Sequence, residues 1–222
     1  AIMALRYFFE EMPQIHVVAA GSLLEFALED ISFPVGRVQF LEMHPMNFME
    51  YLWAIDKKKL SDIICQKPQK VSETIHTMLI AELRNYFFIG GMPETVKVYS
   101  KSKSIYECFD VHKELCETFR QDFAKYAPRS NSACLDTVFS SLAKNVGKQI
   151  KYSQLSRDFS HPTVKNAFDL FCKARIIKKI SSTVPGFPLG ANVSQHKFKA
   201  ILVDIGLWQY LCGMRFDIEF QE

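Results

Sequence analysis

The sequence contains few of the short patterns that identify a compartment or a metal centre. Its apolar runs are far shorter than the roughly 20 residues of a membrane-spanning helix, so we expect no contact with a membrane. Its first residues show no basic leader and no cleavage site, so no secretory signal is expected. The six cysteines never form a CxxC pair, which predicts reduced thiols in the cytoplasm. The six histidines form no HxxxH or HExxH pattern, so no metal site is predicted.

Charge is nearly balanced over the whole chain but is unevenly distributed along it. The 222 residues carry a net charge of +3. Residues 144–199 hold 11 Lys and Arg against 2 Asp and Glu, a local balance of +9, whereas the remainder has a balance of −6. An asymmetry of this size predicts a polyanionic partner for the middle-to-late part of the chain.

The first section of the chain alternates between helix and strand patterns. Residues 1–11 predict a helix, and the apolar, β-branched run at 15–20 is typical of a buried parallel strand. A short helix at 23–28 and a second strand at 37–41 follow, and Pro45 opens another helix. This order predicts an α/β fold for the first section.

The rest of the chain divides into a helical section and a mixed one. From about residue 56 to 126 the pattern is helical throughout, with long helices at 72–88 and 104–126. Three short helices are then expected at 132–146, 153–159 and 162–174, followed by strands at 176–183 and 198–203. Three helices followed by a β-hairpin are the plan of a winged helix-turn-helix.

Two polar residues follow the predicted strands of the first section. Ser22 would lie beyond the carboxyl end of a strand, where its hydroxyl could bind a phosphate or an attacking water. The same residue could instead cap the next helix, with Glu25 completing a capping box. Arg37 follows Gly36 on a tight turn, where it could neutralise a transferring phosphoryl group or simply be a surface arginine.

Four spaced motifs resemble those of a large family of prokaryotic AAA-type P-loop ATPases. The strand ending in Gly21-Ser22, the Gly36-Arg37 pair and the P-x-x-F-x-E-Y-L run at 45–52 occur in that order. GGMPE at 90–94 resembles the GG-x-P-E of the family's helical lid. KFKAILVDIGL at 197–207 resembles the K-x-x-x-x-D-x-G-L element of its C-terminal domain of unknown function.

The resemblance implies a role for each of these positions. Ser22 falls on the sensor-1 position, Arg37 falls on an arginine-finger or phosphate-sensing position, and Gly90, Gly91 and Pro93 belong to the lid. It implies ATP and Mg²⁺ as cofactors of the full-length protein. The sequence itself contains no GxxxxGK[ST] and no apolar run ending in Asp-Glu. We therefore expect no cofactor bound to this chain alone and no ATP hydrolysis by it.

The expected architecture is α/β plus mainly α, in three parts. Residues 1–55 would form the back of an AAA-type parallel sheet, residues 56–128 a helical lid, and residues 129–222 a winged helix with the start of the C-terminal domain. The expected function is to couple ATP binding and hydrolysis to the winged helix. A DNA-binding regulator without ATPase activity and a protein-interaction adaptor remain open as alternatives, as does a homo-oligomer.

The winged helix carries the candidate nucleic-acid contacts. In the candidate recognition helix at 161–176, Val164, Ala167, Phe168 and Phe171 follow the spacing of a core-facing stripe, which leaves the polar side chains outward. Such a helix can enter the major groove of double-stranded DNA, and lysines flanking the hairpin can contact the phosphate backbone. The predicted contact residues are Thr163, Lys165, Asn166, Lys173, Lys178, Lys179, Lys197 and Lys199. Winged helices also bind proteins, so a protein partner remains the alternative.

Overall fold

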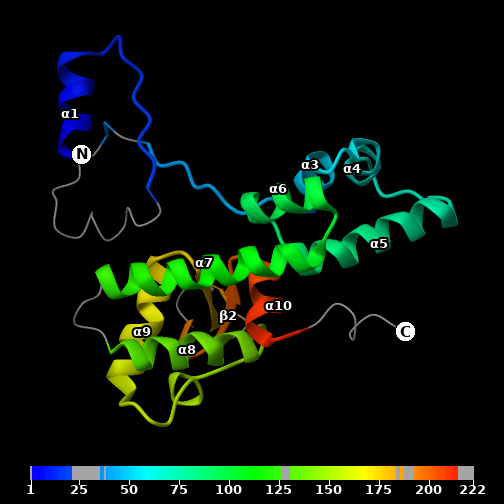
Figure 1. Ribbon diagram of the computed structural model, residues 1–222. Coiled ribbons are helices and arrows are strands. Elements are labelled where there is room, and N and C mark those ends of the chain that lie inside the picture. Colours follow the sequence, from blue (N-terminus) through cyan, green and yellow to red (C-terminus); the bar gives the residue numbers. More distant parts are fainter. Residues whose placement is uncertain are drawn as a thin grey trace.

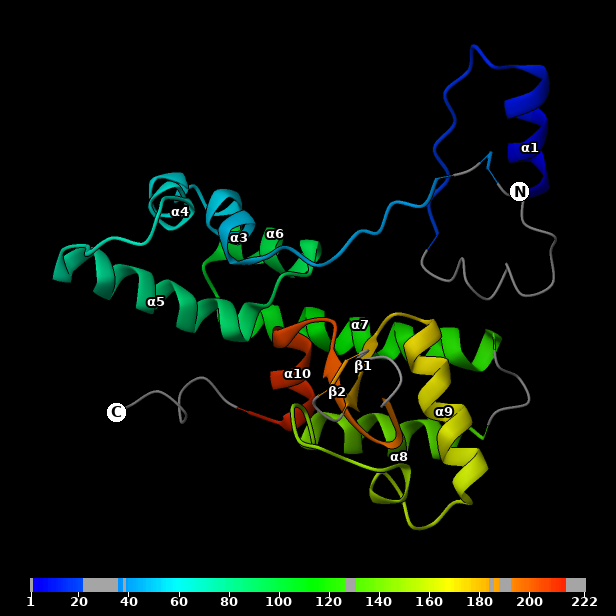
Figure 2. The same cartoon turned by 180° about the vertical axis from the view of Figure 1, so that it is seen from behind.

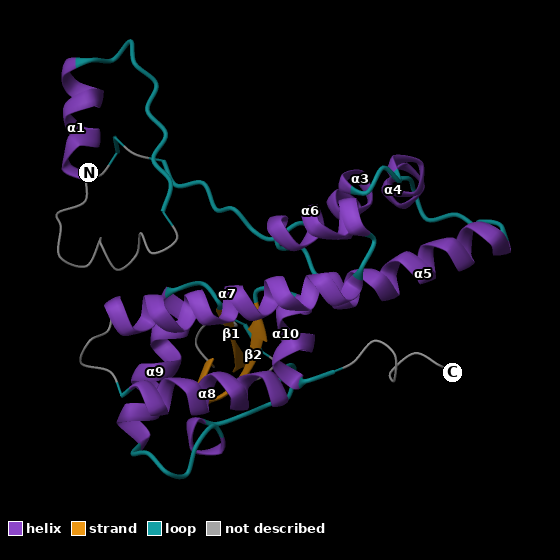
Figure 3. Cartoon of the chain, viewed as in Figure 1, coloured by secondary structure: helices purple, strands orange, loops and turns teal. Residues whose placement is uncertain are grey.

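The computed structural model describes residues 2–21, 36–37, 39–126, 131–183, 186–187 and 193–214. This part of the chain is mainly α-helical and contains one two-stranded antiparallel sheet (Figures 1 and 3). The mainly α part of the predicted architecture is confirmed for the described residues. None of the helices in these ranges is long and apolar enough to cross a membrane.

The predicted parallel sheet is not found in the described residues. Helix α1 (Ile2–Glu11) is present, but residues 16–21 and 39–47 have no regular secondary structure, and Arg37 lies in a turn. Figure 1 shows α1 standing away from α5 and α7. A strand exists only when neighbouring strands satisfy its backbone groups, and within the described ranges these segments have no such neighbour. The strands expected at 15–20 and 37–41 are therefore wrong for the described residues of these segments, which form no regular secondary structure, and the helix expected at 23–28 lies outside the described residues.

The central helices are α3 (Phe48–Ala54), α4 (Lys58–Cys65), α5 (Glu73–Ile89), α6 (Pro93–Ser102) and α7 (Ile105–Tyr126). Local signals define their ends. Asn47 and Glu50 form a capping box at the start of α3, and the Ser72 hydroxyl accepts a hydrogen bond from Ile75 N at the start of α5. Gly90 ends α5 with a φ of 72°, a value that glycine adopts without strain. The helical section expected from residue 56 to 126 is confirmed.

A C-terminal module, which we define as residues 131–212, follows the central helices. It contains α8 (Ser132–Lys144), a 3-10 turn η1 (Tyr152–Gln154), α9 (His161–Lys173), β1 (Ile177–Thr183), β2 (Val193–Leu202) and α10 (Ile205–Cys212). The strands pair antiparallel, with Ile177 opposite Leu202 and Ser181 opposite Phe198. Ile150 forms a further bridge to Phe198 on the other edge of β2. The expected order of three helical segments and a hairpin is confirmed, although the middle one is only a 3-10 turn.

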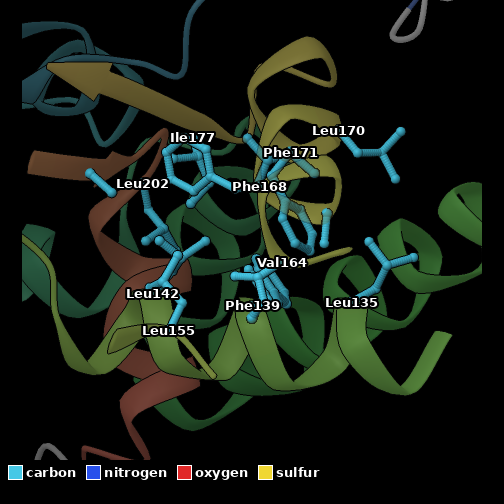
Figure 4. Packing of buried hydrophobic residues seen from close by; sticks show 14 of the residues in the cluster. Leu135, Phe139, Leu142, Leu155, Val164, Phe168, Leu170, Phe171, Ile177 and Leu202 are labelled. Atoms are coloured by element: carbon cyan, nitrogen blue, oxygen red, sulfur yellow. The ribbon is translucent and has the colours of Figure 1, made fainter. Parts of the chain in front are cut away.

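Aromatic side chains fill the core of the C-terminal module. The ring of Phe171 in α9 lies 5.1 Å from Phe139 in α8 and 4.8 Å from Phe123 in α7. Phe168 and Phe198 join α9 to the hairpin with their rings 4.8 Å apart. Figure 4 shows side chains from α8, α9 and the two strands pointing toward one another in this core. Burial of such rings is the main stabilising contribution to a small module of this kind.

Helix α7 belongs to two cores. Its first part contributes Cys108 to a cluster with Tyr51, Leu52 and Phe88 of the central helices. Further along, Cys116 and Phe123 of the same helix lie in the core of the C-terminal module. The central helices and the C-terminal module therefore share one continuous helix as a wall.

Candidate nucleic-acid interface

Helix α9 presents one apolar and one polar face. Its start is fixed by Ser160, whose side chain accepts a hydrogen bond from Thr163 N, and by a proline in the first turn. The predicted core stripe is confirmed, because all four of its members are buried: Val164, Ala167, Phe168 and Phe171. Lys165 and Asn166 are exposed on the other face. The Thr163 hydroxyl is half-buried and lies 2.8 Å from the Ser160 hydroxyl, so it belongs to the cap of the helix.

The hairpin has a buried face and a basic outer face. Phe198, Ala200 and Leu202 of β2 are buried, and the alternation of a β-strand places the residues between them on the opposite face. Lys178, Lys197 and Lys199 are exposed on that outer side. They are accompanied by two half-exposed aliphatic side chains, Ile180 and Ile201. The outer face is therefore a surface of mixed basic and aliphatic character.

Lys179 differs from the other predicted contact residues. It pairs with the buried Ala200, so its side chain starts on the inner face of the hairpin. Its Nζ donates a hydrogen bond of 2.9 Å to the Tyr152 hydroxyl and lies 4.9 Å from the centre of the Phe198 ring. This ammonium group is thus held by the aromatic core through a cation-π contact. We place Lys179 among the residues that support the fold of the module.

The remaining predicted residues form two groups along α9. Lys165 and Asn166 lie in its first half, whereas Lys173 lies in its last turn, about 12 Å further along the axis at 1.5 Å per residue. Lys178 follows closely after that last turn, at the base of β1. Lys173 and Lys178 are thus only five residues apart in the sequence, whereas Lys165 and Asn166 lie at the other end of the helix.

Sequence reasoning missed three basic residues before α9. Lys148, Lys151 and Arg157 are exposed in the segment that joins α8 to α9. Figure 2 shows this segment and the first turn of α9 at the same end of the C-terminal module. These residues add three exposed positive charges to the segment that leads into α9. The +9 balance of residues 144–199 includes them, but the winged-helix pattern predicts contacts from the helix and the hairpin alone.

Of the two residues expected to sense a nucleotide, Arg37 alone lies among the residues that the structure describes. Ser22 lies outside the described residues. Arg37 is partly exposed, and its Nε lies 2.8 Å from the Glu10 carboxylate of α1. Hydrogen bonds and charge from Arg6, with a further contribution from Arg37, hold the pKa of Glu10 below its usual value. Arg37 therefore has an ordinary surface carboxylate as its partner.

The lid glycines of the described structure are already engaged within the protein. Gly90 and Gly91 precede α6, but the Gly91 N–H already donates a 2.6 Å hydrogen bond to the carboxylate of Asp204. A phosphate would have to replace that buried carboxylate. Within the described ranges, no three His, Cys, Asp or Glu side chains are grouped as metal ligands. We derive no chemical step through ATP or Mg²⁺.

The two glycine-containing motifs instead meet in a buried junction. Asp204 caps α10 by accepting a hydrogen bond of 2.9 Å from Leu207 N. Its other oxygen accepts from Gly91, and Gly91 O in turn accepts from Met46 N at 2.7 Å. A Cβ on Gly91 would lie only 1.9 Å from Met46 O, so only glycine allows this approach. We call the set Met46, Gly90, Gly91, His112, Asp204 and Gly206 the junction.

Burial controls ionisation at the junction. Desolvation raises the pKa of the Asp204 carboxyl, although hydrogen bonds from Leu207 and Gly91 oppose the shift. Desolvation lowers the pKa of His112, whose Nε2 lies 3.0 Å from Ile89 O. Outside the junction, desolvation likewise raises the pKa values of buried thiols: that of Cys108 to about 12 and those of Cys116 and Cys172 to about 11. These thiols are protonated near neutral pH, which is the opposite of what a cysteine nucleophile needs.

Comparison with known proteins identifies a family, but the description of that family names no activity. No curated protein matches the chain. A family model described as "Domain of unknown function (DUF8612)" matches residues 80–217. The match begins within α5, contains both halves of the Gly91–Asp204 contact and extends past α10. It covers more than half of the 222 residues. The chain therefore belongs to the DUF8612 family.

Proposed function

We propose that the C-terminal module is a winged helix that binds double-stranded DNA. The observation that carries the proposal is the exposed polar face of α9, with Lys165, Asn166 and Lys173 on a helix whose other face is packed in the core. A helix fixed in this way can be inserted into a major groove without losing its shape. The proposal places the protein in the cytoplasm, where its free thiols would stay reduced.

The two ends of α9 would have different tasks. An asparagine can make a bidentate contact to adenine, and a lysine can reach guanine or a phosphate, so Asn166 and Lys165 are the candidates for reading bases. Lys178 and Lys199 on the outer face of the hairpin would bind the phosphate backbone and fix the orientation of the module. The basic residues before α9 would extend this backbone contact.

Salt dependence tests the proposal. Each phosphate contact contributes roughly −0.9 to the slope of log K against log salt, so three contacts give a slope of about −2.7. We expect fluorescence anisotropy with a labelled DNA duplex to show binding at low salt and such a slope. Replacing Lys165, Lys178 and Lys199 together by alanine should weaken binding and flatten the slope.

The chain offers a matched control for that variant. Lys59, Lys67 and Lys70 are also exposed, and they lie in or after α4, outside the C-terminal module. Their triple alanine variant removes the same charge and should keep most of the affinity. Equal losses in the two variants would mean that the charge of the whole chain matters and α9 does not. Absence of binding at low salt would reject DNA and favour the protein-adaptor alternative.

A second candidate is coupling to an ATPase. It is supported by the resemblance of the motifs and by the junction, where the GG-x-P-E and D-x-G-L motifs hydrogen-bond each other. The lack of a sheet among residues 16–21 and 39–47 weighs against an intact nucleotide domain within this chain. The test is to search the complete reading frame for GxxxxGK[ST] and to assay the full-length protein for ATPase activity with and without DNA. Without the motif, this candidate fails.

A further inference from the structure

An extended segment before α3 contacts the basic module. We call residues 39–47 the strap. Its side chains are largely exposed, with Leu41 at 81% and Met43 at 94% of their full accessibility. One end of the strap is anchored: Met46 N donates to Gly91 O, and the Tyr86 hydroxyl donates to Met46 O, both at 2.7 Å. The C-terminal end of the strap is therefore fixed to the central helices.

A carboxylate of the strap reaches the base of the hairpin. Glu42 Oε1 lies 3.2 Å from Arg175 Nη1. Arg175 occupies the turn between α9 and β1, where it adopts a left-handed φ of 58°. Its neighbours in sequence include Lys173 and Lys178, which belong to the proposed DNA surface. Glu42 is four positions from the Met46 anchor, so at most about 14 Å of chain holds it there.

Charge favours this contact beyond the single ion pair. Residues 1–47 contain six acidic and two basic residues, whereas residues 144–199 have the balance of +9. Opposite net charges on two parts of one chain attract each other, and the attraction weakens as salt rises. A DNA phosphate would bind the same basic residues, so DNA and the strap would compete for them.

We propose that the strap is an autoinhibitory ligand of the C-terminal module, which docks through Glu42 on Arg175 and competes with DNA for the base of the hairpin. The docking of the strap is inferred from the Glu42–Arg175 contact alone. Competition between the strap and DNA rests in addition on the proposed DNA binding. The contact is suited to regulation because it is weak. Its two side chains are 47% and 56% exposed, and ion pairs of this kind change an equilibrium by about five-fold at most. A polyanion can therefore displace the strap.

The first experiment measures docking without DNA. The Arg175 Nε–Hε resonance of ¹⁵N-labelled protein is identified by its loss in Arg175→Lys. We expect this resonance to shift when Glu42 is replaced by glutamine, which removes the charge and keeps the size. Glu11→Gln on the exposed end of α1 is the control and should leave it in place. An unchanged resonance in Glu42→Gln would overturn the proposal.

The second experiment measures competition by anisotropy with a DNA duplex at low salt. Glu42→Lys and Glu11→Lys change the net charge by the same amount. We expect Glu42→Lys to tighten binding two- to five-fold more than Glu11→Lys does, and Glu42→Gln to tighten it less. Equal effects of the two lysine variants would overturn the competition. If the wild-type chain binds no DNA, the proposed function fails, whereas docking is still decided by the resonance.

Discussion

Replacing Asp204 by alanine should be one of the most destabilising changes to a polar side chain in this protein. Asp204 is 4% exposed and holds two segments that are far apart in sequence. Loss of its cap on α10 costs about 1 kcal/mol. The Gly91 N–H would be left buried without its acceptor, at a cost of about 1–3 kcal/mol.

The net effect is smaller than the sum of these two costs. Burial disfavours the ionised carboxylate, as the raised pKa of Asp204 indicates, and alanine removes that penalty. We therefore expect the free energy of unfolding to fall by about 2–3 kcal/mol, a large part of the usual 5–15 kcal/mol. At about 1–3 kcal/mol per molar urea, the midpoint should fall by about 0.7–3 M.

Urea unfolding followed by tryptophan fluorescence is the assay. Trp208 lies in α10, and its Nε1 donates a 2.7 Å hydrogen bond to Ala143 O, so its emission reports directly on the capped helix. Asp204→Asn keeps the shape and an acceptor and should cost less than alanine. Asp62→Ala at an exposed position of α4 is the control for removing a carboxylate. A loss below 1 kcal/mol in Asp204→Ala would refute the reasoning, because the Gly91 contact would then contribute nothing.

Two further predictions concern the same junction. Gly91→Ala should cost at least about 2 kcal/mol, since its Cβ would lie 1.9 Å from Met46 O and would separate the two chains, whereas Gly21→Ala, with open space around it, should be neutral by the same urea assay. His112 has a pKa lowered by burial, so protonation favours the unfolded state, and its contribution to stability is full above 6.5 and is lost as the pH falls below that value. His112→Gln should reduce the difference in unfolding free energy between pH 7.5 and pH 5.5, and an unchanged difference would exclude His112 as its source.

Helices and their caps could be predicted from the sequence because their signals are local. The pattern at 72–88 agrees with α5 (Glu73–Ile89), since Ser72 supplies the cap at its start and Gly90 the stop at its end. The buried stripe of α9 followed from the spacing of Val164, Ala167, Phe168 and Phe171 in the same way. These features depend on neighbours three or four residues away.

The errors arose where a distant partner decides the structure. The apolar run at 15–20 has the composition of a strand, but composition supplies no neighbouring strand to pair with it. The contact between Gly91 and Asp204 joins two motifs whose sequences give no hint of each other. Lys179 is a different case, because the period of two from Ile177 already placed it on the inner face. That signal was present and was overlooked in favour of its charge.

The sharing of α7 by two cores has a practical consequence for dividing the protein. At 1.5 Å per residue its 22 residues span about 33 Å, and the ring of Phe123 near its end covers Phe171 of α9. A fragment that begins at residue 129, the predicted boundary, would lose that ring together with Cys116 and would open the aromatic core to water. A fragment that begins at residue 105 would keep all of α7. Binding studies on the isolated module should therefore use the longer fragment.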